Sequence, residues 1–218
     1  MQEFVNDDEV LFALSRCPAG KSLHHAFIGG LLEHILSLLN LARLIVQNYD
    51  HIDLDLVKTG VVLHDIGKIY ELTYDRTFGY SSEGQLLGHI TIALRMLDQK
   101  CAQLPDFPPR LRLLVEHLIL SHHGKYEFGS PKLPMFPEAL VLHHLDDLDS
   151  KIENMRAIVA AEHQSDGDWT RYSSSLERAL LKKGKFLGVT SHLGQASNKL
   201  MAGGMEPAST SGSPASSR

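Results

Sequence analysis

The residues best suited to chemistry lie around the dipeptide His64-Asp65, at the end of an apolar run. A histidine beside an aspartate offers nitrogen and oxygen ligands at one point of the chain. Other residues of the same types stand on either side of this pair. The candidate ligands are, in chain order, His34, His64, Asp65, His89, His122, His123 and Asp146. This order of residue types predicts a metal-centred hydrolase.

The donor set indicates which ions the site would take and how they would be shared. Imidazoles and carboxylates together suit Mn, Fe, Co and Zn, and Mg more weakly. Asp65 is the natural bridging ligand, because a carboxylate has two oxygens while an imidazole binds through one nitrogen. Two ions about 3.5–4 Å apart can activate a shared water and clamp a phosphoryl group, and Lys68 could add a positive charge there. We therefore expect two divalent ions and hydrolysis of a phosphoester by metal-activated water.

Composition limits the classes of protein that this chain can belong to. Of its 218 residues, 43% are hydrophobic but only 7% are aromatic, which favours a helical core. The net charge of −5 gives no broad basic surface for nucleic acid, although a local patch is compatible with it. Cys17 and Cys101 form no CxxC pair, and no secretion signal or membrane span stands out. We expect a cytoplasmic protein that does not enter the membrane.

Apolar periodicity predicts the helices that must position the candidate ligands. We expect Asn6 and Asp53 as N-caps and a helix stop at Gly67. Residues 70–82 indicate a short hairpin or loop, residues 1–190 one domain, and residues 191–218 a disordered tail. The expected helices cover about residues 6–16, 25–49, 53–66, 83–103, 110–123, 138–163 and 170–183. The fold class is therefore all-α, a helical bundle with a small insertion.

Helical phase places several of these ligands on buried stripes but leaves one choice open. A lone histidine on such a stripe, for example His34 or His122, is more often a satisfied core residue than a ligand. Several polar side chains on inward faces are harder to explain without a metal. On the 138–163 helix, Asp149 projects close to the core stripe, Asp146 at its edge and Asp147 opposite. Spacing therefore disfavours Asp147 but does not choose between Asp146 and Asp149.

Other features have a simpler interpretation beside the functional one. Asp65 could pair with Lys68 at a helix end, with Gly67 merely a C-cap. The aromatic residues of the 124–137 loop, Tyr126, Phe128 and Phe136, fit a base-stacking platform and packing onto the core about equally well. Of the remaining histidines, His51, His163 and His192 are expected at the surface, and His117 is not a ligand candidate. The adjacent pair His143 and His144 is expected either behind the ligands or at the surface.

Over residues 23–155 the chain resembles the HD-domain metal-dependent phosphohydrolase superfamily. It is more closely similar to the catalytic domain of YhaM-type 3′–5′ exoribonucleases. The segment running from Ser-His-His-Gly-Lys to Gly-Ser-Pro-Lys (residues 121–132) is the most specific part of this match. The resembling segments are residues 24–27, 29–34, 63–68, 83–90, 121–125, 128–132 and 142–146.

The resemblance implies an all-α HD fold with two metal ions and assigns a role to each candidate residue. It favours Asp146 over Asp149 as the last ligand, and makes Lys68 a phosphate contact and His123 a ligand or substrate contact. The implied ligands are His34, His64, Asp65 and Asp146 for one metal, and Asp65, His89 and His122 for the other. The implied lining of the substrate cleft is His25, Lys125 and Lys132.

Three functions are compatible with these residues. The first is a phosphodiesterase or phosphomonoesterase acting on nucleotides or on the 3′ ends of short RNA or DNA. The second is a small-molecule nucleotidase, and the third is a non-enzymatic helical module with a structural metal. Exonucleases of the YhaM type carry an oligonucleotide-binding β-barrel before the HD domain. Since Met1 lies just before the region of resemblance, we expect a stand-alone form of the HD domain, natural or recombinant. Without the barrel and with an acidic net charge, we expect phosphoester hydrolysis rather than processive degradation of RNA.

Overall fold

The computed structural model describes residues 1–20, 27–74 and 79–188. The chain divides into two compact units, Met1–Ala161 and Glu162–Arg218. The domain boundary expected near residue 190 stays a prediction. None of the helices in the described ranges is both long and apolar enough to span a membrane.

The first unit is all-α with one small hairpin, as predicted. Leu72 of β1 lies opposite Tyr80 of β2 in an antiparallel pair. The elements of this unit are α1 (Gln2–Val5), α2 (Asp8–Arg16), α3 (Gly30–Val46), α4 (Leu54–Leu63), α5 (Lys68–Glu71), β1 (Leu72–Thr73), β2 (Gly79–Tyr80), α6 (Ser82–Ala102), α7 (Pro109–Ser121), the 3-10 helix η1 (Tyr126–Phe128) and α8 (Pro137–Ala161).

Side-chain caps set where two of these helices begin. The Asp53 carboxylate accepts hydrogen bonds from the backbone N–H groups of Asp55 and Leu56, as expected for the N-cap of α4. The cap predicted at Asn6 is wrong. Asp7 accepts the equivalent bonds at the start of α2, and Asn6 instead ends α1. The helix expected to continue to residue 66 ends at Leu63, and a turn carries the chain into α5.

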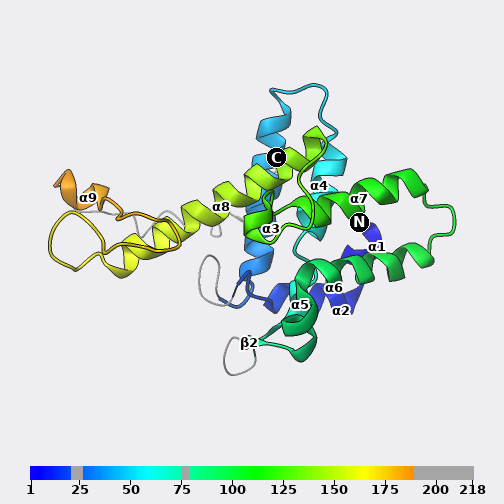
Figure 1. Ribbon diagram of the computed structural model, residues 1–218, viewed down its shortest axis with the longest axis horizontal. Coiled ribbons are helices and arrows are strands. Elements are labelled where there is room, and N and C mark those ends of the chain that lie inside the picture. The colour runs from blue at the N-terminus through cyan, green and yellow to red at the C-terminus, as the bar shows by residue number, and fades with distance from the viewer. Residues whose placement is uncertain (21–26, 75–78, 189–218) are drawn as a thin grey trace, which may run out of the picture. The chain divides into compact units, whose positions relative to one another are not determined.

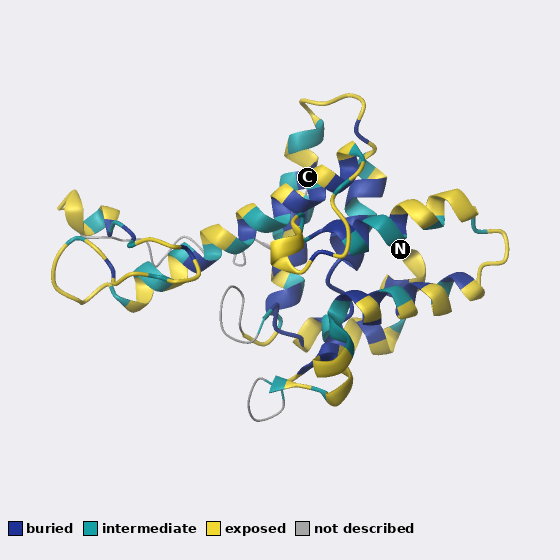
Figure 2. Cartoon of the chain, in the orientation of Figure 1, coloured by how far each residue is buried: buried dark blue, intermediate teal, exposed yellow. Residues whose placement is uncertain are grey.

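Helices α3, α4, α7 and α8 meet around one core (Figure 1). Their facing sides are the buried ones, whereas the outward sides are exposed (Figure 2). The fully buried apolar side chains of this core include Leu31, Leu38, Val57, Val61, Leu118 and Leu142. This packing brings the ends of α4 and α7, where His64 and His122 lie, next to His34 near the start of α3 and Asp146 in the middle part of α8.

Gly67 fits α5 closely against α6. Its φ of −63° is ordinary for a helix, so the residue is not an αL cap of the kind that the sequence indicates. A Cβ at this position would lie 2.1 Å from the His89 carbonyl oxygen and 2.8 Å from the Ala93 nitrogen. Within α6, Gly88 at φ 70° breaks the helix just before His89 and turns that residue toward α5.

The second unit corrects one expectation. Residues 170–183 do not form the expected helix but a loop closed by two antiparallel bridges, Trp169 with Leu181 and Ser173 with Arg178. The sequence there joins residues of high β-propensity, Trp and Tyr, to three consecutive serines, which compete with helical hydrogen bonds. Only the short α9 (Lys183–Phe186) is helical in this segment.

Candidate metal centre

A first group of ligand atoms comes from α3, the end of α4 and α8. The Nε2 atom of His34 lies 3.2 Å from Asp146 Oδ1, and the Nε2 atom of His64 lies 3.9 Å from the same oxygen. His64 Nε2 is also 3.4 Å from Asp65 Oδ2. His34 and His64 are fully buried. One nitrogen from each of these histidines and one oxygen of Asp146 therefore point at a common centre.

A second group comes from α6 and the end of α7. His89, His122 and His123 place ring nitrogens close enough together to share an ion. His89 Nε2 lies 3.4 Å from Asp65 Oδ1, and His122 Nε2 lies 3.8 Å from that oxygen. Asp65 thus directs one oxygen to each group, which is the arrangement that a bridging carboxylate requires.

The donor atoms fit divalent metal ions. Two atoms that each lie about 2.1 Å from one ion can be at most about 4.2 Å apart, and the separations above meet this limit. Among the described residues, several buried atoms at the centre have no hydrogen-bond partner, which is costly without a ligand. These atoms are Nε2 of His64, His89 and His122, and Oδ1 of Asp65.

Hydrogen bonds on the far side of each ring fix which nitrogen faces the centre. Since a carbonyl can only accept, Nδ1 of His64 donates to Val61 O at 2.9 Å, and Nδ1 of His122 donates to Ile119 O at 2.7 Å. Both carbonyls lie three residues earlier, in the last turn of a helix. This local geometry leaves Nε2 without its proton and available to a metal.

Two carboxylates hold the other rings from behind. Glu71 on α5 accepts from the backbone N–H of His89 at 3.0 Å and lies 3.3 Å from its Nδ1. Asp149 lies 2.8 Å from Nδ1 of His34 and also accepts from the Ser37 hydroxyl. Carboxylates of this kind orient a ligating histidine and increase its basicity. No spacing signal in the sequence links Glu71 to His89.

The structure separates the two aspartates that spacing left open. Asp146 faces the centre, with Oδ1 3.2 Å from His34 Nε2, whereas Asp149 lies behind the same ring. Both carboxylates contact His34 because they are three residues apart and so lie on one face of α8. The geometry thus agrees with the choice of Asp146 as the candidate ligand and gives Asp149 a supporting position.

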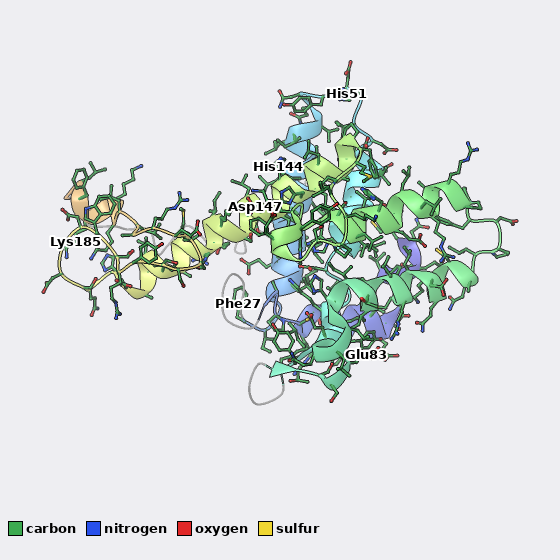
Figure 3. The ribbon with its side chains drawn as sticks, viewed as in Figure 1. Phe27, His51, Glu83, His144, Asp147 and Lys185 are labelled. Carbon is green, nitrogen blue, oxygen red and sulfur yellow. The ribbon has the colours of Figure 1, made fainter. Side chains whose placement is uncertain are left out.

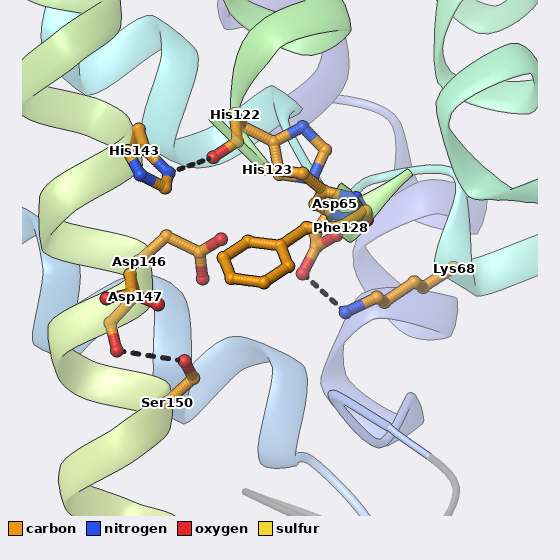
Figure 4. A pocket seen from close by; sticks show the side chains of 9 residues that line it. All are labelled: Asp65, Lys68, His122, His123, Phe128, His143, Asp146, Asp147 and Ser150. Atoms are coloured by element: carbon orange, nitrogen blue, oxygen red, sulfur yellow. Dashed lines mark hydrogen bonds and ion pairs between the residues drawn. The ribbon is translucent and has the colours of Figure 1, made fainter. Parts of the chain in front are cut away.

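A cavity of about 420 Å³ opens onto this centre. Lys68 lies on its wall and donates to Asp65 Oδ2 at 2.6 Å and to Ala19 O at 2.7 Å (Figure 4). Asp65, His122, His123 and Asp146 also line it. Another wall residue is His143, whose Nδ1 donates to His122 O at 2.9 Å. Gly124, at φ 74°, packs against the His143 ring, where a Cβ would come within 2.2 Å.

Asp65 and His122 have the protonation states that a metal ligand needs, whereas His34 does not. Burial opposes ionisation of Asp65, but Lys68 and His64 beside it hold its pKa well below the usual range. Burial also lowers the pKa of His122 and keeps the ring neutral. Although burial lowers the pKa of His34, its hydrogen bonds to Asp146 and Asp149 raise it to about 9. A metal at His34 would therefore displace a proton.

The structure brings some other predicted residues to the cavity and not others. His25 lies outside the described residues. His123 faces the cavity and is fixed by donation from Nδ1 to Phe128 O at 2.9 Å. Lys125 and Lys132 are exposed, and neither is among the described residues that line the cavity. Their assignment to the substrate cleft stays a prediction.

Of the other described histidines in the first unit, only His143 lines the cavity. His117 accepts from the Met135 N–H and so anchors the loop before α8. His51 and His144, both labelled in Figure 3, line a second, apolar pocket of about 350 Å³ beside the start of α8. His163 is exposed, and His192 lies outside the described residues. Of the adjacent pair, only His143 reaches the metal side.

Fold and site together define the class of protein. Residues 31–151 match the HD domain family, and the chain belongs to that family. Over 169 aligned residues the chain is 43% identical to the 3′-5′ exoribonuclease YhaM of Bacillus subtilis (strain 168). It is 41% identical, over the same length, to the 3′-5′ exoribonuclease YhaM of Bacillus pumilus (strain SAFR-032). The matched region is 78% of this chain and 53% of each relative, so the chain spans about half their length. No solved structure gave a significant match.

Proposed function

We propose that the unit Met1–Ala161 hydrolyses phosphodiester bonds at the 3′ ends of RNA with two divalent ions. The observation that carries this proposal is the position of Asp65, whose two oxygens face two separate groups of histidines. A purely structural metal site is closed, with all its positions filled by protein ligands, whereas this centre opens into a cavity. The similarity to exoribonucleases supports RNA as the substrate.

Each group around the cavity has a distinct role in this proposal. When bound, the ions would activate a water and stabilise the charge that develops on the phosphoryl oxygens. His34, His64 and Asp146 would hold one ion, His89 and His122 the other, and Asp65 both. Mn, Fe, Co and Zn suit this set of nitrogen and oxygen donors best.

Residues beside the ligands would act on the substrate. Lys68 already donates to Asp65 at 2.6 Å, so its ammonium lies within reach of a phosphate placed over that carboxylate. The Nδ1 proton of His123 is held by Phe128 O, which leaves Nε2 free to act as a further metal ligand or, when the ring is protonated, to donate to a phosphoryl oxygen. Both cysteines are free thiols, in keeping with the proposed cytoplasmic location.

Metal content and turnover measured together test this function. The protein would be analysed for bound metal and assayed on single-stranded RNA with a free or a blocked 3′ end, single-stranded DNA and mononucleotides. We expect about two ions per chain, and cleavage only of RNA with a free 3′ end. Asp65→Asn should abolish turnover and reduce the metal content. Asp55→Asn, which changes an exposed carboxylate paired with Lys58, is the matched control.

Other outcomes would lead to different conclusions. Cleavage of mononucleotides without cleavage of RNA would replace this function with that of a nucleotidase. One tightly held ion with no turnover on any substrate would indicate a structural metal in a binding module. Unchanged turnover in Asp65→Asn would remove the basis of the proposed metal centre.

A further inference from the structure

We propose that Phe128 is the surface on which the base of the substrate's terminal nucleotide stacks. This inference rests on the proposed function and adds a determinant of specificity to the same cavity. Phe128 ends η1, within the most specific sequence segment (residues 121–132), and its ring lines the cavity together with Asp65 and Lys68 (Figure 4).

The composition of the cavity wall is the first reason. Apart from Phe128, the described lining residues are polar or charged: Asp65, Lys68, His122, His123, His143, Asp146, Asp147 and Ser150. A phosphoester substrate brings an organic group as well as a phosphate. Phe128 is therefore the lining residue that offers a broad apolar surface to that group. A flat nucleobase matches a phenyl face, and such stacking tolerates every base.

The exposure of the ring is the second reason. The Phe128 residue remains 51% exposed, so its ring is not used to pack the loop onto the core. Phe136 of the same loop takes that role, since it packs against the core and lies 5.3 Å from the His117 ring. The two explanations for the loop aromatics thus apply to different residues.

The rigidity of the backbone around Phe128 is the third reason. Its carbonyl accepts from His123 Nδ1 at 2.9 Å, and its N–H donates to Lys125 O at 3.1 Å. Gly129 follows at φ 80° and closes the turn. Because His123 belongs to the candidate metal centre, the hydrogen bond ties the ring position to that centre. A stacking surface held in this way loses little entropy when a base binds.

A nearby charge agrees with a nucleotide as the occupant. Lys125 Nζ lies 5.3 Å from the centre of the Phe128 ring. An ammonium beside an aromatic face combines the two features that single-stranded nucleic acid requires, a cation for the backbone and a π surface for the base. Lys125 would therefore act on the substrate from the rim rather than from the cavity wall.

The test compares two RNA oligonucleotides that differ only in whether the 3′-terminal ribose carries a base. For the full chain loaded with Mn²⁺, we expect kcat/KM to be about 5- to 150-fold higher with the base, the range that one stacked base gives. Phe128→Ala should reduce this ratio to about 1 by lowering kcat/KM for the oligonucleotide that carries the base. Phe128→Trp should restore the ratio. Tyr126→Ala is the matched control, because Tyr126 is exposed on the same turn and is not among the cavity-lining residues.

The possible failures can be told apart. If wild-type protein cleaves both oligonucleotides and Phe128→Ala keeps the wild-type preference for the base, Phe128 is not the platform, although the proposed function stands. An equal loss of cleavage on both oligonucleotides, with metal content and circular dichroism unchanged, would also overturn the stacking role. No cleavage of either by wild-type protein would overturn the proposed function and the platform with it.

Discussion

Gly67→Ala distinguishes a packing role for this glycine from a conformational one. Because Gly67 has a helical φ of −63°, alanine fits its backbone. If only conformation mattered, alanine would restrict the unfolded chain and stabilise the protein by about 0.4–1 kcal/mol. The structure predicts the opposite sign, because the new methyl group would lie 2.1 Å from the His89 carbonyl oxygen.

The size of the effect follows from the clearance that the methyl group needs. The contact must open from 2.1 Å to at least 3.0 Å, and both nearest groups, in His89 and Ala93, are backbone atoms that cannot rotate away. α6 must therefore move by about 1 Å relative to Gly67. Overpacking of this kind costs about 1–3 kcal/mol. Such a shift also exceeds the tolerance of about 0.2 Å in a metal–ligand distance, so His89 would no longer reach its ion.

Urea denaturation and metal analysis measure the two effects separately. We expect Gly67→Ala to lose about 1–3 kcal/mol of unfolding free energy and to retain about one ion instead of two. Gly79→Ala is the control, because its nearest neighbour is the Thr73 hydroxyl at 3.0 Å, a side chain that can move. A Gly67→Ala protein with increased stability and full metal content would refute the packing explanation.

Three further changes test other parts of the centre. Asp149→Asn should weaken metal binding at the His34 group about 10- to 100-fold, because it removes the carboxylate behind that ring; a competition titration with a chelator measures this. Lys68→Gln should lower kcat about 100-fold while two ions remain bound, as metal analysis alongside steady-state kinetics would show. Asp53→Ala should cost about 0.5–2 kcal/mol in urea denaturation through loss of the α4 cap, with no change in metal content.

The sequence predicted the main helices of the first unit well because apolar periodicity is a local property. Their ends were less predictable, since they depend on contacts with other elements. The helix expected to reach residue 66 ends at Leu63, where the chain turns so that His64 and Asp65 face the centre. On α8, apolar spacing places Leu148 and Ile152 on one stripe with the buried Leu145, yet they are 47% and 53% exposed. The apolar spacing of a long helix therefore does not define its buried face accurately, because that face depends on which elements pack against the helix.

The candidate ligands could be found from the sequence because their residue types are rare on inward faces. The residues that support them could not, because glutamates, serines and aspartates are common on helices. Glu71 is 18 positions from His89 and contacts it only because α5 and α6 meet at Gly67 and Gly84. For the same reason the sequence does not decide the place of His143, whose contact with His122 arises from the crossing of α7 and α8.

The pair Asp146 and Asp149 shows why residue type and spacing are insufficient where a ligand and its support share a helix face. Three residues apart, both carboxylates reach the same His34 ring, one at each nitrogen. Which of them faces a metal depends on the side of the ring from which the other groups approach. His64 and Asp65 approach from the Nε2 side, because α4 packs against both α3 and α8 there. Exchanging the two roles would require moving α4, so the helix packing, rather than the aspartates themselves, decides between them.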